Sequence, residues 1–140
     1  MKAIVDAVRN RYFNQIGAGS GDPLPTQYDN AEFTKPNPQD PTTPVWAAFS
    51  IRLGDAVRAD IGSTASRRFR VVGVAYVQLF GPVDKGQENI LTIADRVVAA
   101  FRDVVASSIT YRTPSVSIPG RDGGWWQVTV ACPFQADYLA

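Results

Sequence analysis

The segment from Arg67 to Tyr138 constrains the fold most, because its hydrophobic pattern changes from strand to helix and back to strand. Residues 67–80 form a long, largely apolar run rich in β-branched side chains, which indicates a strand. Residues 88–105 carry apolar side chains every three or four positions, which indicates an amphipathic helix. Two further strands are predicted at 111–118 and 125–134, on either side of a glycine-rich turn. This order predicts a sheet with a helix packed on it.

Several details of this segment carry structural expectations. Val71–Val77 is apolar throughout, which is typical of a strand covered on both faces. Gly73 within it predicts a bulge or a close approach by another part of the chain. Asp84 and Gln87 have the spacing of a capping box in front of the helix. The apolar stripe of that helix consists of Ile90, Ile93, Ala94, Val97, Phe101, Val104 and Val105.

The N-terminal half contributes one more helix and one more strand. Residues 45–53 alternate between apolar and other side chains, which predicts a half-buried strand that ends at Gly54. A length of 140 residues suits one domain. We therefore expect a single α+β domain over 1–140, with a mixed, mainly antiparallel four-stranded sheet and two packed helices. The apolar stripe of the first helix, predicted over residues 3–16, consists of Ile4, Val5, Val8, Tyr12 and Ile16.

Residues 17–44 differ from the rest of the chain in containing six prolines. Neither a helical nor a strand period survives such spacing, so we expect an extended arm without regular structure. Its larger apolar residues, Leu24, Tyr28 and Phe33, are too few for a core but numerous enough to dock on a partner. A flexible linker and an arm that orders on assembly are both compatible with this composition, and we favour the arm.

The sequence contains no recognisable catalytic motif. It contains no histidine, which excludes Ser-His-Asp and Cys-His catalysis. Its single cysteine, Cys132, falls on the inward face of the last predicted strand, which is typical of a core residue. The acidic residues are scattered, and no apolar run approaches the roughly 20 residues of a membrane span. We expect no catalytic, cofactor-binding or metal-binding residues, no membrane partner, and a protein that is not an enzyme.

Surface contacts are the remaining candidates for function. Arg67, Arg68 and Arg70 form a dense basic cluster, for which a solvated strand end, a protein contact and a nucleic-acid contact all stay open. The net charge of +1 provides no global field that would attract nucleic acid. Trp46 and Trp125 lie on the more polar faces of their strands, either as core under a helix or as an exposed contact patch. The predicted contact residues are Leu24, Tyr28, Phe33, Arg52, Arg67, Arg68, Arg70, Arg121 and Asp122.

The order of elements and the texture of four segments carry a family resemblance. These segments are VWAAFSIRLG (45–54), RRFRVVGVAYVQLFGPVDKG (67–86), ILTIADRVVAAFR (90–102) and VSIPGRDGGWWQVTVACPFQADYL (116–139). Together with a leading amphipathic helix and a long loose segment, the chain resembles the tail terminator proteins of long-tailed bacteriophages, of the lambda minor tail protein U type.

The resemblance implies a structural role in the phage virion. It implies a homo-hexameric ring on the head-proximal end of the tail tube, which stops tube polymerisation and offers a head-joining surface. The implied partners are further copies of the chain, the tail tube protein and a head-side connector or neck protein, with no cofactor. Genomic DNA would pass through the lumen without specific binding, and assembly would occur in the host cytoplasm. Another head–tail neck or tail-completion protein, or a nucleic-acid-binding α/β module, are the alternative interpretations.

Overall fold

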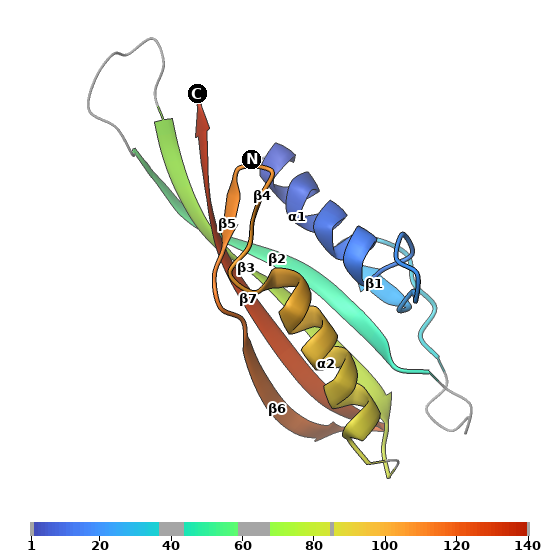
Figure 1. Ribbon diagram of the computed structural model, residues 1–140. Coiled ribbons are helices and arrows are strands. Elements are labelled where there is room, and N and C mark those ends of the chain that lie inside the picture. Colours follow the sequence, from blue (N-terminus) through green and yellow to red (C-terminus); the bar gives the residue numbers. More distant parts are fainter. Residues whose placement is uncertain (1, 37–43, 59–67, 85, 140) are drawn as a thin grey trace.

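One mixed sheet with two helices on it makes up the fold (Figure 1). The computed structural model describes residues 2–36, 44–58, 68–84 and 86–139. Strands follow the order β1-β2-β3-β7-β5-β4, and β6 also pairs with β7. The elements are α1 (Lys2–Gln15), β1 (Thr26–Tyr28), β2 (Trp46–Arg58), β3 (Arg68–Pro82), α2 (Glu88–Phe101), β4 (Val105–Ala106), β5 (Ile109–Tyr111), β6 (Ser115–Asp122) and β7 (Trp125–Leu139).

The predicted α+β class, with two helices and a mixed, mainly antiparallel sheet, is confirmed. β1 runs parallel to β2, and the other strand pairs of the described residues are antiparallel. The predicted number of four strands is wrong, since the sheet has seven. β1, β4 and β5 are only two or three residues long, which is too short for a hydrophobic period to show. The strand predicted over 111–118 is two strands, because the chain crosses from β5 to β6 at Pro114.

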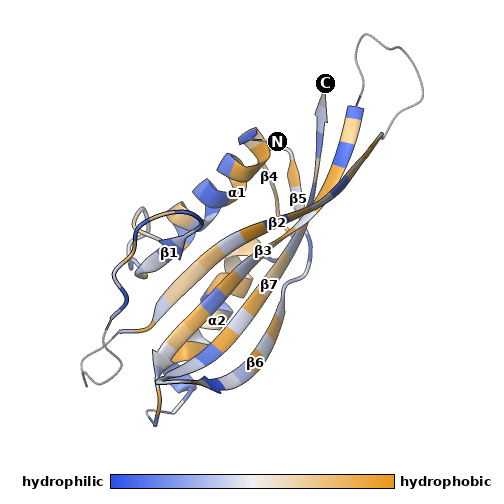
Figure 2. Cartoon of the chain, turned by 180° about the vertical axis from the view of Figure 1, so that it is seen from behind, coloured by the Kyte–Doolittle hydropathy of each residue, from blue (hydrophilic) through white to orange (hydrophobic). Residues whose placement is uncertain are grey.

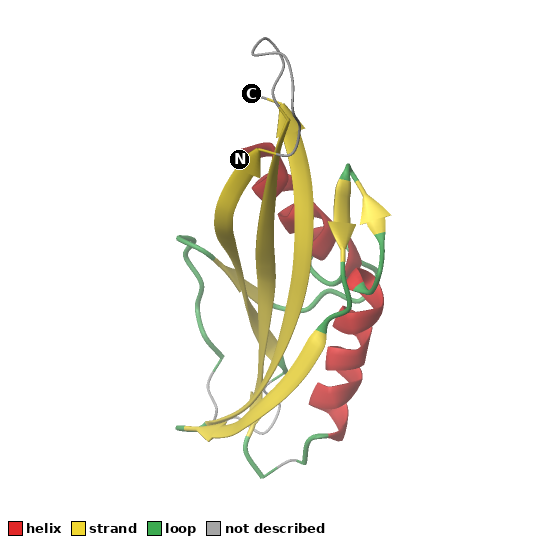
Figure 3. Ribbon diagram, turned by 90° about the vertical axis from the view of Figure 1, so that its left-hand side faces the viewer, coloured by secondary structure: helices red, strands yellow, loops and turns green. Residues whose placement is uncertain are grey.

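Both helices pack on the same face of the sheet (Figure 3). A row across that face joins Phe49 of β2, Val77 of β3 and Val130 of β7. From α1, the ring of Tyr12 stacks on Phe49 with centroids 4.4 Å apart. From α2, the fully buried Phe101 belongs to the same core cluster. The stripes predicted for the two helices, apart from Val5 and Val105, therefore meet in one core.

The expectation that β3 is covered on both faces is wrong. Its residues alternate, with Val71, Gly73, Ala75 and Val77 buried and Val72, Val74 and Tyr76 half-buried or exposed. Val72 retains 52% of its accessible surface. Within the described residues neither α1 nor α2 lies over this second face, which is called the open face below.

Two predicted helix boundaries also require correction. α2 ends at Phe101 rather than at residue 105, and Val105 is 72% exposed at the start of β4. Asp103 adopts a φ of 50°, a left-handed conformation in which the chain leaves the helix. The capping box is absent, because Gln87 occupies the N-cap position without a side-chain hydrogen bond. Asp84 instead sits in a turn with a φ of 62°.

β2 and β3 form a longer hairpin than predicted, because β2 continues past Gly54 to Arg58. A register shift between Leu53 and Ala56 marks a β-bulge that lets the strand continue. Opposite the bulge, a Cβ placed on Gly73 would lie 2.6 Å from Cζ of Phe134 and 3.0 Å from the carbonyl oxygen of Arg52. The close approach predicted at Gly73 is therefore confirmed.

The expectation that residues 17–44 hold neither a strand nor core residues is wrong for the part from 17 to 36. Leu24 is buried in the main core, Tyr28 packs against that core, and β1 lies within this segment. The hydroxyl of Thr26 donates to the Leu24 carbonyl and accepts from the Tyr12 hydroxyl at 2.8 Å, which ties β1 to α1. Residues 37–43 lie outside the described part of the chain.

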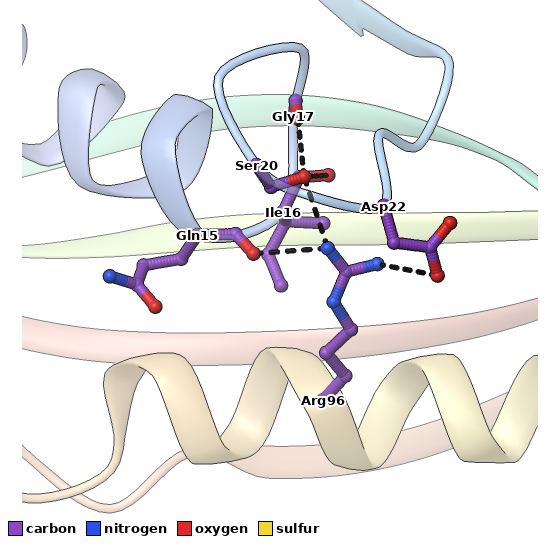
Figure 4. Close-up of polar contacts among 6 residues, drawn as sticks. All are labelled: Gln15, Ile16, Gly17, Ser20, Asp22 and Arg96. Carbon is purple, nitrogen blue, oxygen red and sulfur yellow. Dashed lines mark hydrogen bonds and ion pairs between the residues drawn. The ribbon is translucent and has the colours of Figure 1, made fainter.

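A second tie involves Arg96 of α2 (Figure 4). Its guanidinium donates to the carbonyl of Gln15 and to the hydroxyl of Ser20, both at 3.1 Å, and lies 3.7 Å from the carboxylate of Asp22. The Ser20 hydroxyl donates in turn to the Gly17 carbonyl. The turn that follows α1 is therefore attached to both helices.

Leu24→Ala is expected to lower the free energy of unfolding by about 2 kcal/mol, because it empties space in the core that the chain would not fully refill. Glu32→Ala, an exposed position in the same segment, is the control and is expected to change it by less than about 0.5 kcal/mol. Urea denaturation of both variants is the measurement. Equal and small losses would show that the segment does not belong to the core.

Candidate interaction surfaces

The three apolar residues predicted to anchor the arm on a partner all contact their own chain. Leu24 is buried and Tyr28 packs on Tyr12 and Phe49, with ring centroids 6.1 Å from each. Burial raises the pKa of Tyr28 above its ordinary value. Phe33 packs against Trp46 on the open side of the sheet, with centroids 5.4 Å apart. In this fold all three attach the segment to the rest of the chain.

One arginine of the predicted basic cluster is paired with a carboxylate. Arg70 makes a two-pronged ion pair with Asp137 of β7, with distances of 2.8 and 3.2 Å. The hydrogen bond from Arg70 lowers the pKa of the Asp137 carboxyl and raises that of the guanidinium. Arg68 is exposed near the end of the same strand, and Arg67 lies outside the described residues. Because Arg70 is paired with a carboxylate, the cluster offers less charge to a phosphate backbone than the sequence suggests.

Arg121 and Asp122 lie at the other end of the sheet, in the hairpin between β6 and β7. The Arg121 guanidinium pairs at 2.9 Å with Asp84, which lies in the turn that leads into α2. A shallow cleft of about 290 Å³ lies here, with Arg121 and Trp126 in its lining. The tight turn predicted from the glycines is confirmed, with Gly123 at a φ of 60°. Asp122 pairs with Trp125 in the strand register.

The predicted contact residues therefore do not form one site. Arg52 is exposed on the open face at the middle of β2, opposite Val74, whereas Arg70 lies near one end of β3. Arg121 belongs to the opposite end, and Leu24 is in the core.

The open face of the sheet is the surface that the sequence interpretation missed (Figure 2). One row across it joins Ser50, Tyr76, Ala131 and Ser115, each half-buried or exposed. Interface cores are poor in charged residues and rich in aromatic ones, and this face has that character between Arg52 and Trp46. In the sequence, this face is marked by the residues that alternate with the core positions of the strands. They are Ala48, Ser50, Val74, Tyr76, Gln78, Ser115, Ser117, Gln127, Thr129 and Ala131.

An aromatic cluster closes one end of this face. Trp46 stacks on Phe80 with ring centroids 4.4 Å apart. Trp125 packs edge-on against Trp46, with centroids 5.5 Å apart. With Phe33 beside it, Trp46 is only 2% exposed. No helix is involved, so Trp46 matches neither of the two interpretations proposed for the tryptophans, while Trp125 is half-buried. Trp46 is buried by other aromatic rings on the face opposite the helices.

Cys132 is not an activated thiol, and the described residues hold no cluster of metal ligands. Burial raises the pKa of the Cys132 thiol to about 12, which makes it a poor nucleophile near neutral pH. No three His, Cys, Asp or Glu side chains lie close enough to hold a metal ion in the described ranges. Among these residues, no helix is long and apolar enough to cross a membrane.

Comparison with known proteins identifies relatives at the level of family and fold. The model of a family described as phage tail terminator protein matches residues 3–134. Seven solved chains match as well. One superposes with a TM-score of 0.64 and 18% sequence identity over 96% of this chain and 93% of its own. An identity this low shows a shared fold alone. No curated protein matches.

Proposed function

The chain belongs to the phage tail terminator family, and we propose that it assembles into a ring that caps the head-proximal end of the tail tube. The family match carries this proposal, because residues 3–134 include both helices and nearly all of the sheet. In this role the ring stops tube polymerisation and offers a surface to a head-side neck protein. Six copies per ring, and a place in the lambda minor tail protein U subfamily, rest on the sequence resemblance.

The open sheet face supports a role in assembly. It combines half-buried aromatic and small polar side chains with a charge-free centre, as interface cores do. A ring requires two different patches on each copy, one for each neighbour, and the tube and neck require further ones. A subunit with small net charge also suits a lumen through which DNA must slide.

Tail tubes that polymerise in vitro provide the test. Adding the protein is expected to stop elongation and yield capped tubes of uniform length. Elongation that continues unchanged would overturn the proposal. Joining of heads to tails without an effect on length would identify a neck or tail-completion protein instead.

Thr129→Glu is expected to weaken this activity at least about tenfold, because it places an unpaired charge at the centre of the open face and each factor of ten corresponds to about 1.4 kcal/mol. The control is Thr92→Glu, the same substitution at an exposed position of α2 on the other side of the sheet. Tube length against protein concentration is the measurement, with thermal melting to verify that both variants fold. Equal activities would show that the open face contacts neither tube nor neighbour.

A further inference from the structure

We propose that the free edge of β2, from Ile51 to Val57, pairs with the free edge of β6 in a second copy of this chain. The inference rests on the proposed ring and specifies which two surfaces meet between neighbours. It predicts a sheet that continues from one subunit into the next.

Hydrogen bonding identifies the free edge of β2. β1 pairs only with Ala47–Phe49. The Ala47 N–H donates to the Pro25 carbonyl at 2.9 Å, away from β3, and the Ile51 N–H reaches a carboxylate oxygen of Asp29 at 3.4 Å. Because strand residues alternate, Leu53 also directs its N–H and C=O away from β3. No strand of the described chain lies there to receive them.

The surroundings of that edge suit an added strand. A groove of about 400 Å³ runs beside it, lined by Val5 and Arg9 of α1 together with Asp29, Ile51 and Leu53. An extended segment can bind such an edge through main-chain hydrogen bonds while its side chains contact the apolar wall. Leu53 is 37% exposed at this position.

β6 supplies a complementary edge. It pairs with β7 on one side, and no described strand pairs with its other side. Residues 115–118 carry no charge, although exposed edges are commonly protected by charged side chains. Val116 and Ile118 are 44% and 47% exposed. β4 is also at an edge but is only two residues long, so β6 is the better match for a strand of several residues.

The apolar side chains at the two edges lie on the same face of the sheet. Leu53 lies opposite Gly73 and Val116 opposite Val130, so both side chains are on the face that bears the helices. Joining the edges would bring these apolar side chains together as cross-strand neighbours.

β6 runs antiparallel to β2, since both are ordered relative to β7 through antiparallel pairs. If a rotation about an axis parallel to the strands carries one copy onto its neighbour, strand directions are kept. β6 of the neighbour would therefore meet β2 in an antiparallel junction. Residues 115–117 of β6 lie level with residues 48–50 of β2, and strand tilt supplies the stagger that a closed ring needs. A contact between two different edges closes by rotation, as a ring requires.

Disulfide trapping between two single-cysteine proteins tests the junction in a Cys132→Ala background. Leu53→Cys is mixed with Val116→Cys or with Ile118→Cys, both free and on tail tubes, and oxidised. A mixed disulfide is expected for one of the two pairs. The control is Leu53→Cys mixed with Val105→Cys, a more exposed edge position that should not form it. Same-variant disulfides alone, or equal trapping with Val105→Cys, would overturn the junction.

Leu53→Pro tests whether strand pairing itself is involved. Proline removes the outward N–H while leaving the ladder to β3 intact, and Leu53→Ala controls for the lost side chain. Subunit association is expected to fall at least tenfold further in the proline variant than in the alanine variant, with similar melting temperatures. Equal association would overturn the inference. Tubes still capped by wild-type protein would leave the proposed function standing, whereas trapped pairs that cap no tubes would overturn the function alone.

Discussion

Phe101→Ala is expected to lower the free energy of unfolding by about 3–5 kcal/mol. The Phe101 ring is fully buried, meets Tyr111 of β5 edge-on at 5.4 Å and lies 5.9 Å beneath the guanidinium of Arg11. Arg11 also donates to the Ala100 carbonyl at 2.8 Å, so the end of α2, the flank of α1 and β5 meet at this ring. Urea denaturation monitored by tryptophan fluorescence measures the loss.

Val105→Ala is the matched control for this substitution. The sequence places both residues on one helical stripe, whereas the structure leaves Val105 72% exposed beyond the end of α2. Its expected change is within about 0.5 kcal/mol. A loss below about 1 kcal/mol for Phe101→Ala would contradict the packing of α2 on the sheet.

Gly73→Val is expected to cost about 3 kcal/mol, because the core has no space for its side chain. The first added carbon would already lie 2.6 Å from the buried Phe134 ring and 3.0 Å from the main chain of β2. The ring of Phe134 contacts other core residues and cannot move aside without displacing them. Thermal and urea melts are the measurement.

Alanine at two buried glycines separates crowding from the general effect of removing glycine. A Cβ at Gly81 would meet atoms no closer than 3.6 Å, which is ordinary contact. Gly81→Ala is therefore expected to stay within about 1 kcal/mol of the wild type, while reduced freedom of the unfolded chain offsets part of the cost at both sites. Gly73→Ala is expected to be clearly the less stable of the two. The reverse order would show that β2 and β7 do not approach so closely at Gly73.

Long periodic elements were predictable from the sequence. The helix expected over residues 3–16 is α1, and the strand expected over 125–134 is the first part of β7, with Val128, Val130 and Cys132 buried as the alternation requires. Periodicity reports burial along a single element, so it succeeds where one face of a long element is buried. It gave no warning that β2 passes Gly54, because a bulge lets a strand continue through a residue that usually ends one.

Short strands and the ends of elements depend on partners distant in the chain. β1 exists because Ala47 and Phe49 lie beside it, and its own three residues carry no period. The proline-rich segment seemed too poor in apolar residues for a core. Leu24 is nonetheless buried, because α1 and β2 supply the rest of the apolar surface around it.

The sequence by itself determined the order of the main elements, the apolar stripes of both helices, the tight turn at Gly123 and the absence of histidine. Each of these is a local property of neighbouring residues. Only the tertiary structure decided that both helices cover the same face, that the other face is open, and that Arg70 is paired with Asp137. These depend on which segments meet across the sheet, and a period along one strand distinguishes its two faces without showing what will cover them.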